Sequence, residues 1–191
     1  MNKKIGIDID DVLVHLVKHF YDFYNQKFKK DLNAENHFEY DFMGPFGISA
    51  EEAISLIKEF YFTEYFDNLD LIEASVDSIH ELSKEHEIFF ITSRHLDIKD
   101  KTENLLQKLF PTIKYTLIFS GEFWQEAKSK VEICEEVGVS IMIEDNESYA
   151  LDCAKKGIKV FLLDKPWNQN YEGHENIMRV KDWKQIMEKL K

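Results

Sequence analysis

Short apolar runs that alternate with helical patterns constrain the fold of this chain more than any other feature. The runs are five to seven residues long and rich in Ile, Val and Phe: IGIDI (5–9), EIFFIT (87–92), YTLIFS (115–120), VSIMIE (139–144) and IKVFLLD (158–164). Brief runs of this kind are typical of parallel strands buried on both faces. We therefore expect a parallel sheet as the centre of the molecule.

Amphipathic helices are predicted between these strands. Apolar residues recur at helical spacing over residues 75–85, 100–110, 129–137 and 148–156. Ser129 with Glu132 has the spacing of a capping box, and Gly138 and Gly157 are typical of helix C-termini. We also expect an edge strand at 177–180 and a closing helix from Asp182. The alternation predicts an α/β fold, with a Rossmann-like parallel sheet sandwiched by helices.

The interval between the first and second strands is much longer than one crossover needs. Helical apolar stripes cover residues 16–28 and 49–61, and the stretch 37–47, which holds Gly and Pro, suits a loop. We expect residues 15–73 to form a small, aromatic-rich helical cap inserted between strands one and two. The α/β core would then comprise residues 1–14 and 74–191.

Composition limits the partners. The chain has 24 basic and 36 acidic residues and a net charge of −12, so a nucleic acid polymer or an anionic membrane is not expected to bind it. The first residues lack the apolar stretch of a signal peptide, and we expect a cytoplasmic protein. Cys134 and Cys153 have no CxxC spacing and are expected as reduced, buried thiols. The oligomeric state is left open.

Polar residues follow the predicted strands, and the carboxyl ends of parallel strands share one edge of the sheet. These residues are Asp8, Asp10 and Asp11; Thr92, Ser93 and Arg94; Ser120 and Gly121; and Glu144, Asp145 and Asn146. Carboxylates that face each other from two strands need a divalent cation, and oxygen ligands favour Mg²⁺. The hydroxyls of Thr92 and Ser93, with Lys130 at a helix start, can hold a phosphoryl group.

The three aspartates near the N-terminus are expected to have different tasks. Asp8 and Asp10 are two residues apart on a strand and point to the same face, so that one could attack phosphorus and the other transfer a proton. Asp11 points away or lies in the following turn. We expect it to be structural, in a turn or a helix cap.

Four segments, DIDDV, ITSR, KSKVEIC and IEDN, resemble in order and strand position the four motifs of the haloacid dehalogenase-like (HAD) superfamily. The resemblance implies that Asp8 is the nucleophile that forms an aspartyl-phosphate. It implies that Asp10 protonates the leaving oxygen and then activates water. Thr92, Ser93 and Lys130 would bind the phosphate. Mg²⁺ would be held by Asp8, by Asp10 through its backbone carbonyl, and by Asp145, with Glu144 behind this ligand set.

The cap and the KPWNQ and RVKDWKQI segments are similar to those of 5′(3′)-deoxyribonucleotidase-like nucleotidases. That likeness implies nucleoside monophosphates as substrates, deoxy forms included. A phosphatase for another small phosphometabolite, such as a sugar phosphate, and a non-catalytic phosphate- and Mg²⁺-binding regulatory protein stay open as alternatives. The aromatic residues of the cap and the three tryptophans, Trp124, Trp167 and Trp183, are expected to serve packing.

Some positions depart from the family pattern or leave the assignment open. Many relatives have Gly where this chain has Asp11, and Asp where it has Glu144. Lys128 stands close enough to Lys130 to compete for the motif-three role. His15 and His19 share a helix face but lack a third ligand, so we expect no zinc site.

Overall fold

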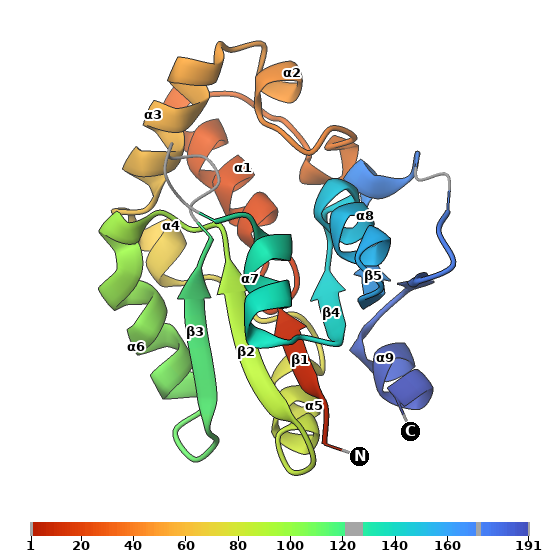
Figure 1. Ribbon diagram of the computed structural model, residues 1–191. Coiled ribbons are helices and arrows are strands. Elements are labelled where there is room, and N and C mark those ends of the chain that lie inside the picture. Colours follow the sequence, from red (N-terminus) through yellow and green to blue (C-terminus); the bar gives the residue numbers. More distant parts are fainter. Residues whose placement is uncertain (1, 121–127, 171–172, 191) are drawn as a thin grey trace.

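The computed structural model describes residues 2–120, 128–170 and 173–190. Gly121 and Trp124 lie outside these ranges. In the described residues a six-stranded sheet has the order β3-β2-β1-β4-β5-β6, and every neighbouring pair is parallel (Figure 1). The strands are β1 (Lys4–Ile7), β2 (Glu87–Thr92), β3 (Tyr115–Phe119), β4 (Ile141–Glu144), β5 (Lys159–Leu163) and β6 (Ile177–Val180). The predicted edge strand is confirmed, since β6 is the last strand of this order.

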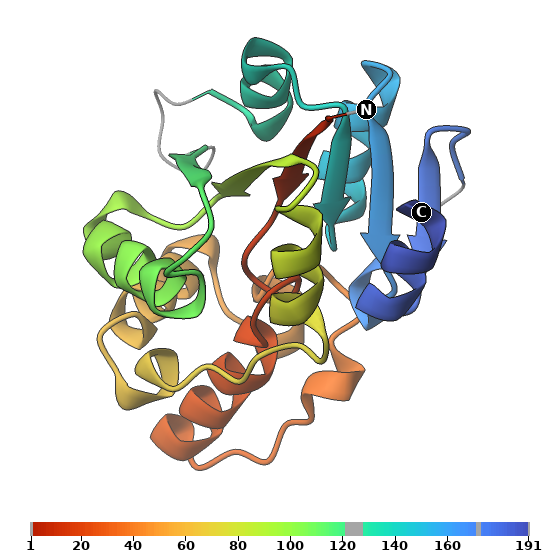
Figure 2. The ribbon, with the colours of Figure 1, turned by 90° about the horizontal axis from the view of Figure 1, so that it is seen from below.

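Helices cover both faces of the sheet because alternate strand residues point to opposite sides. Phe90 packs with residues of α5 (Ser75–Leu82), α6 (Lys99–Leu109) and α9 (Trp183–Leu190). Its neighbour Phe89 packs with residues of α7 (Lys130–Val137) and α8 (Glu147–Lys155). Figure 2 shows α5 and α7 on opposite sides of β1. The predicted α/β, Rossmann-like fold is confirmed.

Local capping residues determine where α7, the helix that carries Lys130, begins and ends. Ser129 accepts a hydrogen bond from the backbone N–H of Glu132, whose side chain accepts one from Ser129 in return, so α7 begins at Lys130 as a capping box. The helix ends at Gly138, whose φ of 75° is easily adopted only by glycine. The sequence-based boundaries of this helix are therefore close to the observed ones.

Residues 15–73, which we call the cap segment, form short helices with a hydrophobic cluster of their own. They are α1 (Leu16–Phe28), η1 (Ala34–Asn36), α2 (Met43–Phe46), α3 (Ala50–Phe60) and α4 (Glu64–Asp67). The ring centroid of Phe20 lies 4.2 Å from that of Phe42 and 5.3 Å from that of Phe60. Figure 1 shows α1, α2 and α3 above the carboxyl ends of the central strands. The division into a core and a cap domain stays a prediction.

Two further 3₁₀ turns lie near the sheet edge that carries the site: η2 (Leu96–Ile98) follows β2, and η3 (Pro166–Asn168) follows β5.

Cys134 and Cys153 are free and buried, as predicted. Within the described ranges, no helix combines the length and the apolar character needed to cross a membrane.

Candidate active site

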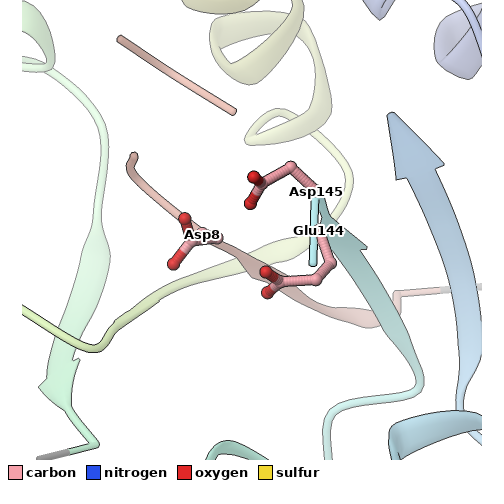
Figure 3. Close-up of side chains that lie close together, drawn as sticks. All are labelled: Asp8, Glu144 and Asp145. Atoms are coloured by element: carbon pink, nitrogen blue, oxygen red, sulfur yellow. The ribbon is translucent and has the colours of Figure 1, made fainter. Parts of the chain in front are cut away.

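Three carboxylates meet where β1 and β4 end side by side. The backbone N–H of Asp8 donates to the carbonyl of Ile143 at 3.0 Å, which aligns the ends of the two strands. Asp8, Glu144 and Asp145 each offer a carboxylate oxygen, and these atoms lie within 4.8 Å of one another. Figure 3 shows Glu144 and Asp145 directed toward Asp8. The strand-end positions in the sequence are therefore brought together as expected.

Lys130 binds this cluster from the first turn of α7. Its Nζ lies 2.6 Å from Oδ1 of Asp8 and 3.0 Å from Oε2 of Glu144, and its side chain is buried. Lys128, the other candidate in the sequence, lies at the surface and pairs with Glu136. Lys130 is thus the lysine that contacts the cluster.

The charges of this cluster are not balanced by the side chains alone. Burial raises the pKa of Asp8, of Glu144 and of Asp145 to about 7 each, and repulsion between neighbouring carboxylates adds to the effect. Burial alone would lower the pKa of Lys130, but Asp8 and Glu144 raise it well above its ordinary value. One ammonium leaves three ionised carboxylates with two uncompensated negative charges, which a divalent cation bound beside Lys130 would neutralise.

The donor set fits a hard divalent cation. Carboxylate oxygens are the ligands that Mg²⁺ prefers in proteins. Both oxygens of Glu144 already accept hydrogen bonds, one from Lys130 and the other from the backbone N–H of Asn146. One carboxylate oxygen of Asp8 accepts a hydrogen bond from Lys130, and one of Asp145 accepts a hydrogen bond from Trp167. The second oxygen of each is left for a cation. This difference agrees with the expectation that Asp8 and Asp145 bind the cation directly and that Glu144 does not.

Asp10 does not point into the acidic cluster. Its carboxylate pairs with Arg94, whose Nη2 lies 2.7 Å from Oδ1 and whose Nε lies 3.0 Å from Oδ2. Any contribution of Asp10 to metal binding would therefore come from its backbone carbonyl. The sequence placed Arg94 at the end of the second strand but gave no sign of this pairing.

The two predicted phosphate-binding hydroxyls lie in different surroundings. Thr92 is fully buried, and its Oγ1 accepts a hydrogen bond from the backbone N–H of Arg94. Ser93 lines a cavity that opens toward the cap segment, and its Oγ lies 3.0 Å from Oγ of Ser120. Ser93 is thus the hydroxyl that faces the space open to a ligand.

Asp11 contacts the cap segment instead of the acidic cluster. Its Oδ2 accepts a hydrogen bond at 3.1 Å from the backbone N–H of Val17, in the first turn of α1. Its φ of 56° lies in the left-handed region, where glycine is favoured but Asp is tolerated. Both features agree with the structural role expected of Asp11.

The residues that hold Asp145 were not found from the sequence. Nε1 of Trp167 donates to Oδ2 of Asp145 at 2.9 Å, and Nδ2 of Asn168 donates to its backbone carbonyl at 2.7 Å. Both belong to η3, after β5. The sequence predicts a packing role for Trp167. Its place in the KPWNQ segment, which resembles nucleotidases, is the one signal that indicates a role at the site.

An apolar cavity of about 290 Å³ opens above the cluster toward the cap segment. Asp8, Asp10, Asp145, Ser93, Arg94 and Lys130 line it from the core. The lining from the cap segment is mostly apolar or aromatic, with Asp41 as its charged residue and no cation among the described residues. A ligand would therefore place its charged end in the core and an apolar or aromatic part in the cap.

Comparison with known proteins identifies the family. The family model described as "5' nucleotidase, deoxy (Pyrimidine), cytosolic type C protein" matches residues 2–190. The chain belongs to this family. A Bacillus cereus protein named "Putative nucleotidase" is 27% identical over 98% of both chains, and a Clostridium acetobutylicum protein named "Nucleotidase" is 26% identical over 95% of this chain and 90% of its own. The chain is a hydrolase of the phosphatase and nucleotidase class.

Solved structures show the same fold. A haloacid dehalogenase-like hydrolase of Streptococcus pneumoniae has a TM-score of 0.71 at 15% identity and covers 100% of this chain and 99% of its own. A HAD-hydrolase of Bacillus subtilis, solved bound to magnesium, has a TM-score of 0.64 at 12% identity and covers 99% of this chain and 98% of its own. The fold predicted from the resemblance to the HAD superfamily is confirmed.

Proposed function

We propose that this family member is a Mg²⁺-dependent phosphomonoester hydrolase that acts on nucleoside monophosphates through an aspartyl-phosphate. The observation that carries the proposal is the buried contact of Lys130 with Asp8, beside Asp145 and at the floor of the apolar cavity. A buried nucleophile with a fixed ammonium next to it is suited to a phosphoryl group, whose negative charge needs a cation.

The chain's own residues account for both halves of the reaction. A carboxylate oxygen of Asp8 attacks phosphorus, and the bond from phosphorus to the leaving oxygen breaks while Asp10 gives that oxygen its proton. Asp10, now ionised, takes a proton from water, whose oxygen attacks the same phosphorus. The bond between phosphorus and the Asp8 oxygen breaks, so that inorganic phosphate leaves and the carboxylate of Asp8 is regenerated.

Lys130 and Ser93 are proposed to hold the phosphoryl oxygens, and Thr92 to support the strand end that carries Ser93. Lys130 supplies charge and Ser93 supplies a hydroxyl at the cavity wall, while Thr92 supports the same strand end from a buried position. Asp8 and Asp145, with the backbone carbonyl of Asp10, would hold Mg²⁺. When bound, the ion would neutralise charge that develops on the phosphoryl oxygens.

The cavity supports a substrate with one phosphate and an apolar or aromatic part. A second phosphate group would need another cation, and the described cap lining offers none. A polyhydroxylated sugar would lose hydrogen bonds to water against aromatic walls such as Phe20, Phe42 and Phe60. A nucleobase, which has a flat π-face, fits such walls better.

The proposal is tested with a panel of nucleoside 5′- and 3′-monophosphates, nucleoside diphosphates and sugar phosphates, each with Mg²⁺ and with EDTA. We expect nucleoside monophosphates to give the highest kcat/KM and EDTA to abolish turnover. Better turnover of sugar phosphates would leave a phosphatase and exclude the nucleotidase.

Two substitutions separate the chemistry from the fold. Asp8→Asn should reduce kcat by at least about 10³-fold, because it removes the nucleophile. Lys128→Gln, a matched surface change two residues from Lys130, should leave the rates unchanged. Full activity of Asp8→Asn would refute the aspartyl-phosphate mechanism, and an inactive wild type would favour the non-catalytic alternative.

A further inference from the structure

Arg94 is a buried arginine beside the proposed proton donor, and the proposed reaction gives it no task. It follows Thr92 and Ser93 at the end of β2 and is 2% exposed. Its Nε and Nη2 each bind one carboxylate oxygen of Asp10, at 3.0 and 2.7 Å. Such a fork fixes the plane of the carboxylate as well as its position.

The core holds the other end of the guanidinium. Nη1 of Arg94 donates to Oγ1 of Thr102 at 3.3 Å, and that hydroxyl donates to the carbonyl of Ile98 at 3.0 Å. Thr102 is fully buried in α6. Burial opposes the charge of Arg94, but Asp10 raises its pKa above the ordinary value, so Arg94 stays charged.

The cap segment covers the face of the same guanidinium. Its central carbon lies 4.9 Å from the ring centroid of Phe66 in α4, which is close enough for a cation–π contact. The Phe66 ring in turn packs on Phe60 at 5.6 Å and on Tyr61 at 5.2 Å, between ring centroids. Phe60 and Tyr61 line the cavity. A ligand there would therefore contact residues that pack on Phe66, whose ring lies over Arg94.

We propose that Arg94 is a positioning residue that orients the carboxyl of Asp10 for proton transfer to the leaving oxygen and ties this orientation to the cap segment through Phe66. The inference rests on the proposed function. Asp10 lines the cavity and its side chain is 23% exposed, so without Arg94 its carboxyl would be free to turn to other orientations there. Arg94 neither gives nor takes a proton; the proton passes from Asp10 to the leaving oxygen as the bond to phosphorus breaks.

The leaving group provides the test. The alkoxide of a nucleoside 5′-monophosphate is strongly basic and needs a proton, whereas p-nitrophenolate leaves without one. A general acid contributes about 10²–10⁴-fold where it is needed. We expect Arg94→Gln to lower kcat/KM, which reports only the steps up to departure of the leaving group, about 10²-fold on the best nucleoside monophosphate of the panel and less than about 5-fold on p-nitrophenyl phosphate. Arg94→Lys, which keeps the charge but not the fork, should recover part of the loss.

Further variants keep the test decisive. Thr102→Val preserves side-chain volume and removes the acceptor of Nη1, and Phe66→Leu removes the ring above the guanidinium. Each should shift the ratio of the two rates in the same direction as Arg94→Gln, by a smaller factor. Lys99→Gln is the control, since Lys99 lies in α6 like Thr102 but forms an exposed ion pair with Glu103. It should leave the ratio unchanged.

The outcomes are distinguishable. Equal losses on both substrates in a folded Arg94→Gln would overturn the positioning role and leave the hydrolase intact. If Arg94→Gln does not fold, as judged by circular dichroism, an unchanged ratio in Thr102→Val would overturn it. A wild type inactive on every phosphomonoester would refute the proposed function itself, and this inference with it.

Discussion

Asp11 has a left-handed backbone conformation, and its side chain accepts a hydrogen bond from the backbone N–H of Val17 in the first turn of α1. Asp11→Ala should lower the free energy of unfolding by about 1–2 kcal/mol, because alanine has no cap acceptor and disfavours positive φ. Asp11→Asn keeps both properties and removes a charge that burial disfavours, so it should be at least as stable as the wild type at pH 7. Urea unfolding measures these differences. An Ala variant as stable as Asn would show that neither property matters.

The residues of the candidate site were predictable to the extent that strand ends determine them. Asp8, Lys130 and Asp145 lie together because parallel strands and a capped helix direct them to one edge of the sheet. The pairing of Asp10 with Arg94 was not predictable, because β1 ends at Ile7 and the strand alternation that was expected to put Asp10 on the face of Asp8 does not reach these two residues. Side-chain packing around the site decides between them.

The helices differ in how far local sequence specifies them. α7 and α3 begin at capping boxes, and their starts follow from Ser and Glu at the required spacing. α2 and α4 are four residues long, too short to be stable by themselves, and exist because Phe42, Phe46 and Phe66 pack into the cap cluster. Tertiary contacts of this kind leave no periodic signal in the sequence.

His37 joins the cap segment to η3 and predicts a pH dependence at this scale. It is fully buried, lies 3.1 Å from the Tyr21 hydroxyl through Nδ1, and packs edge-on against Trp167 at 5.5 Å between ring centroids. Burial lowers its pKa to about 4 from 6.5. The unfolded chain therefore takes up a proton at His37 before the folded chain does, and stability falls as pH drops from 6.5 toward 4.

Thermal unfolding at pH 7.0 and 4.5 measures this contribution. The wild type should lose more Tm over this interval than His37→Phe, which has no group to protonate, by the equivalent of about 2–3 kcal/mol. His86→Gln, at the amino end of the sheet, is the control and should follow the wild type. Equal losses of Tm in the wild type and His37→Phe would mean that His37 is not held neutral.

At the scale of the whole molecule, the order of elements was predictable and the cavity was not. A parallel sheet with one long insertion follows from where the apolar runs stand, and the insertion must begin at the carboxyl end of β1. The shape of the cavity depends on how aromatic side chains such as Phe20, Phe42 and Phe60 pack across α1, α2 and α3. Many such packings share the same apolar pattern.

The C-terminal helix α9 is hydrogen-bonded to the segment that follows β1, and this long-range contact predicts an effect on the stability of the whole fold. Trp183 of α9 is fully buried, and its Nε1 donates to the carbonyl of Val12 at 2.8 Å. Trp183→Ala should cost about 3–5 kcal/mol in urea unfolding, because it leaves a large cavity. Trp183→Phe keeps most of the ring and should cost about 1–3 kcal/mol, chiefly from the unpaired buried carbonyl.

A neighbouring substitution on the same helix separates this link from helix stability in general. Lys184→Ala removes an exposed ion pair with Glu73 and should change the free energy of unfolding by less than about 1 kcal/mol. Because Val12 lies four residues after Asp8, Trp183→Phe should also lower kcat more than Lys184→Ala does. Equal stability and equal kcat in Trp183→Phe and Lys184→Ala would show that the hydrogen bond to Val12 supports neither the fold nor the site.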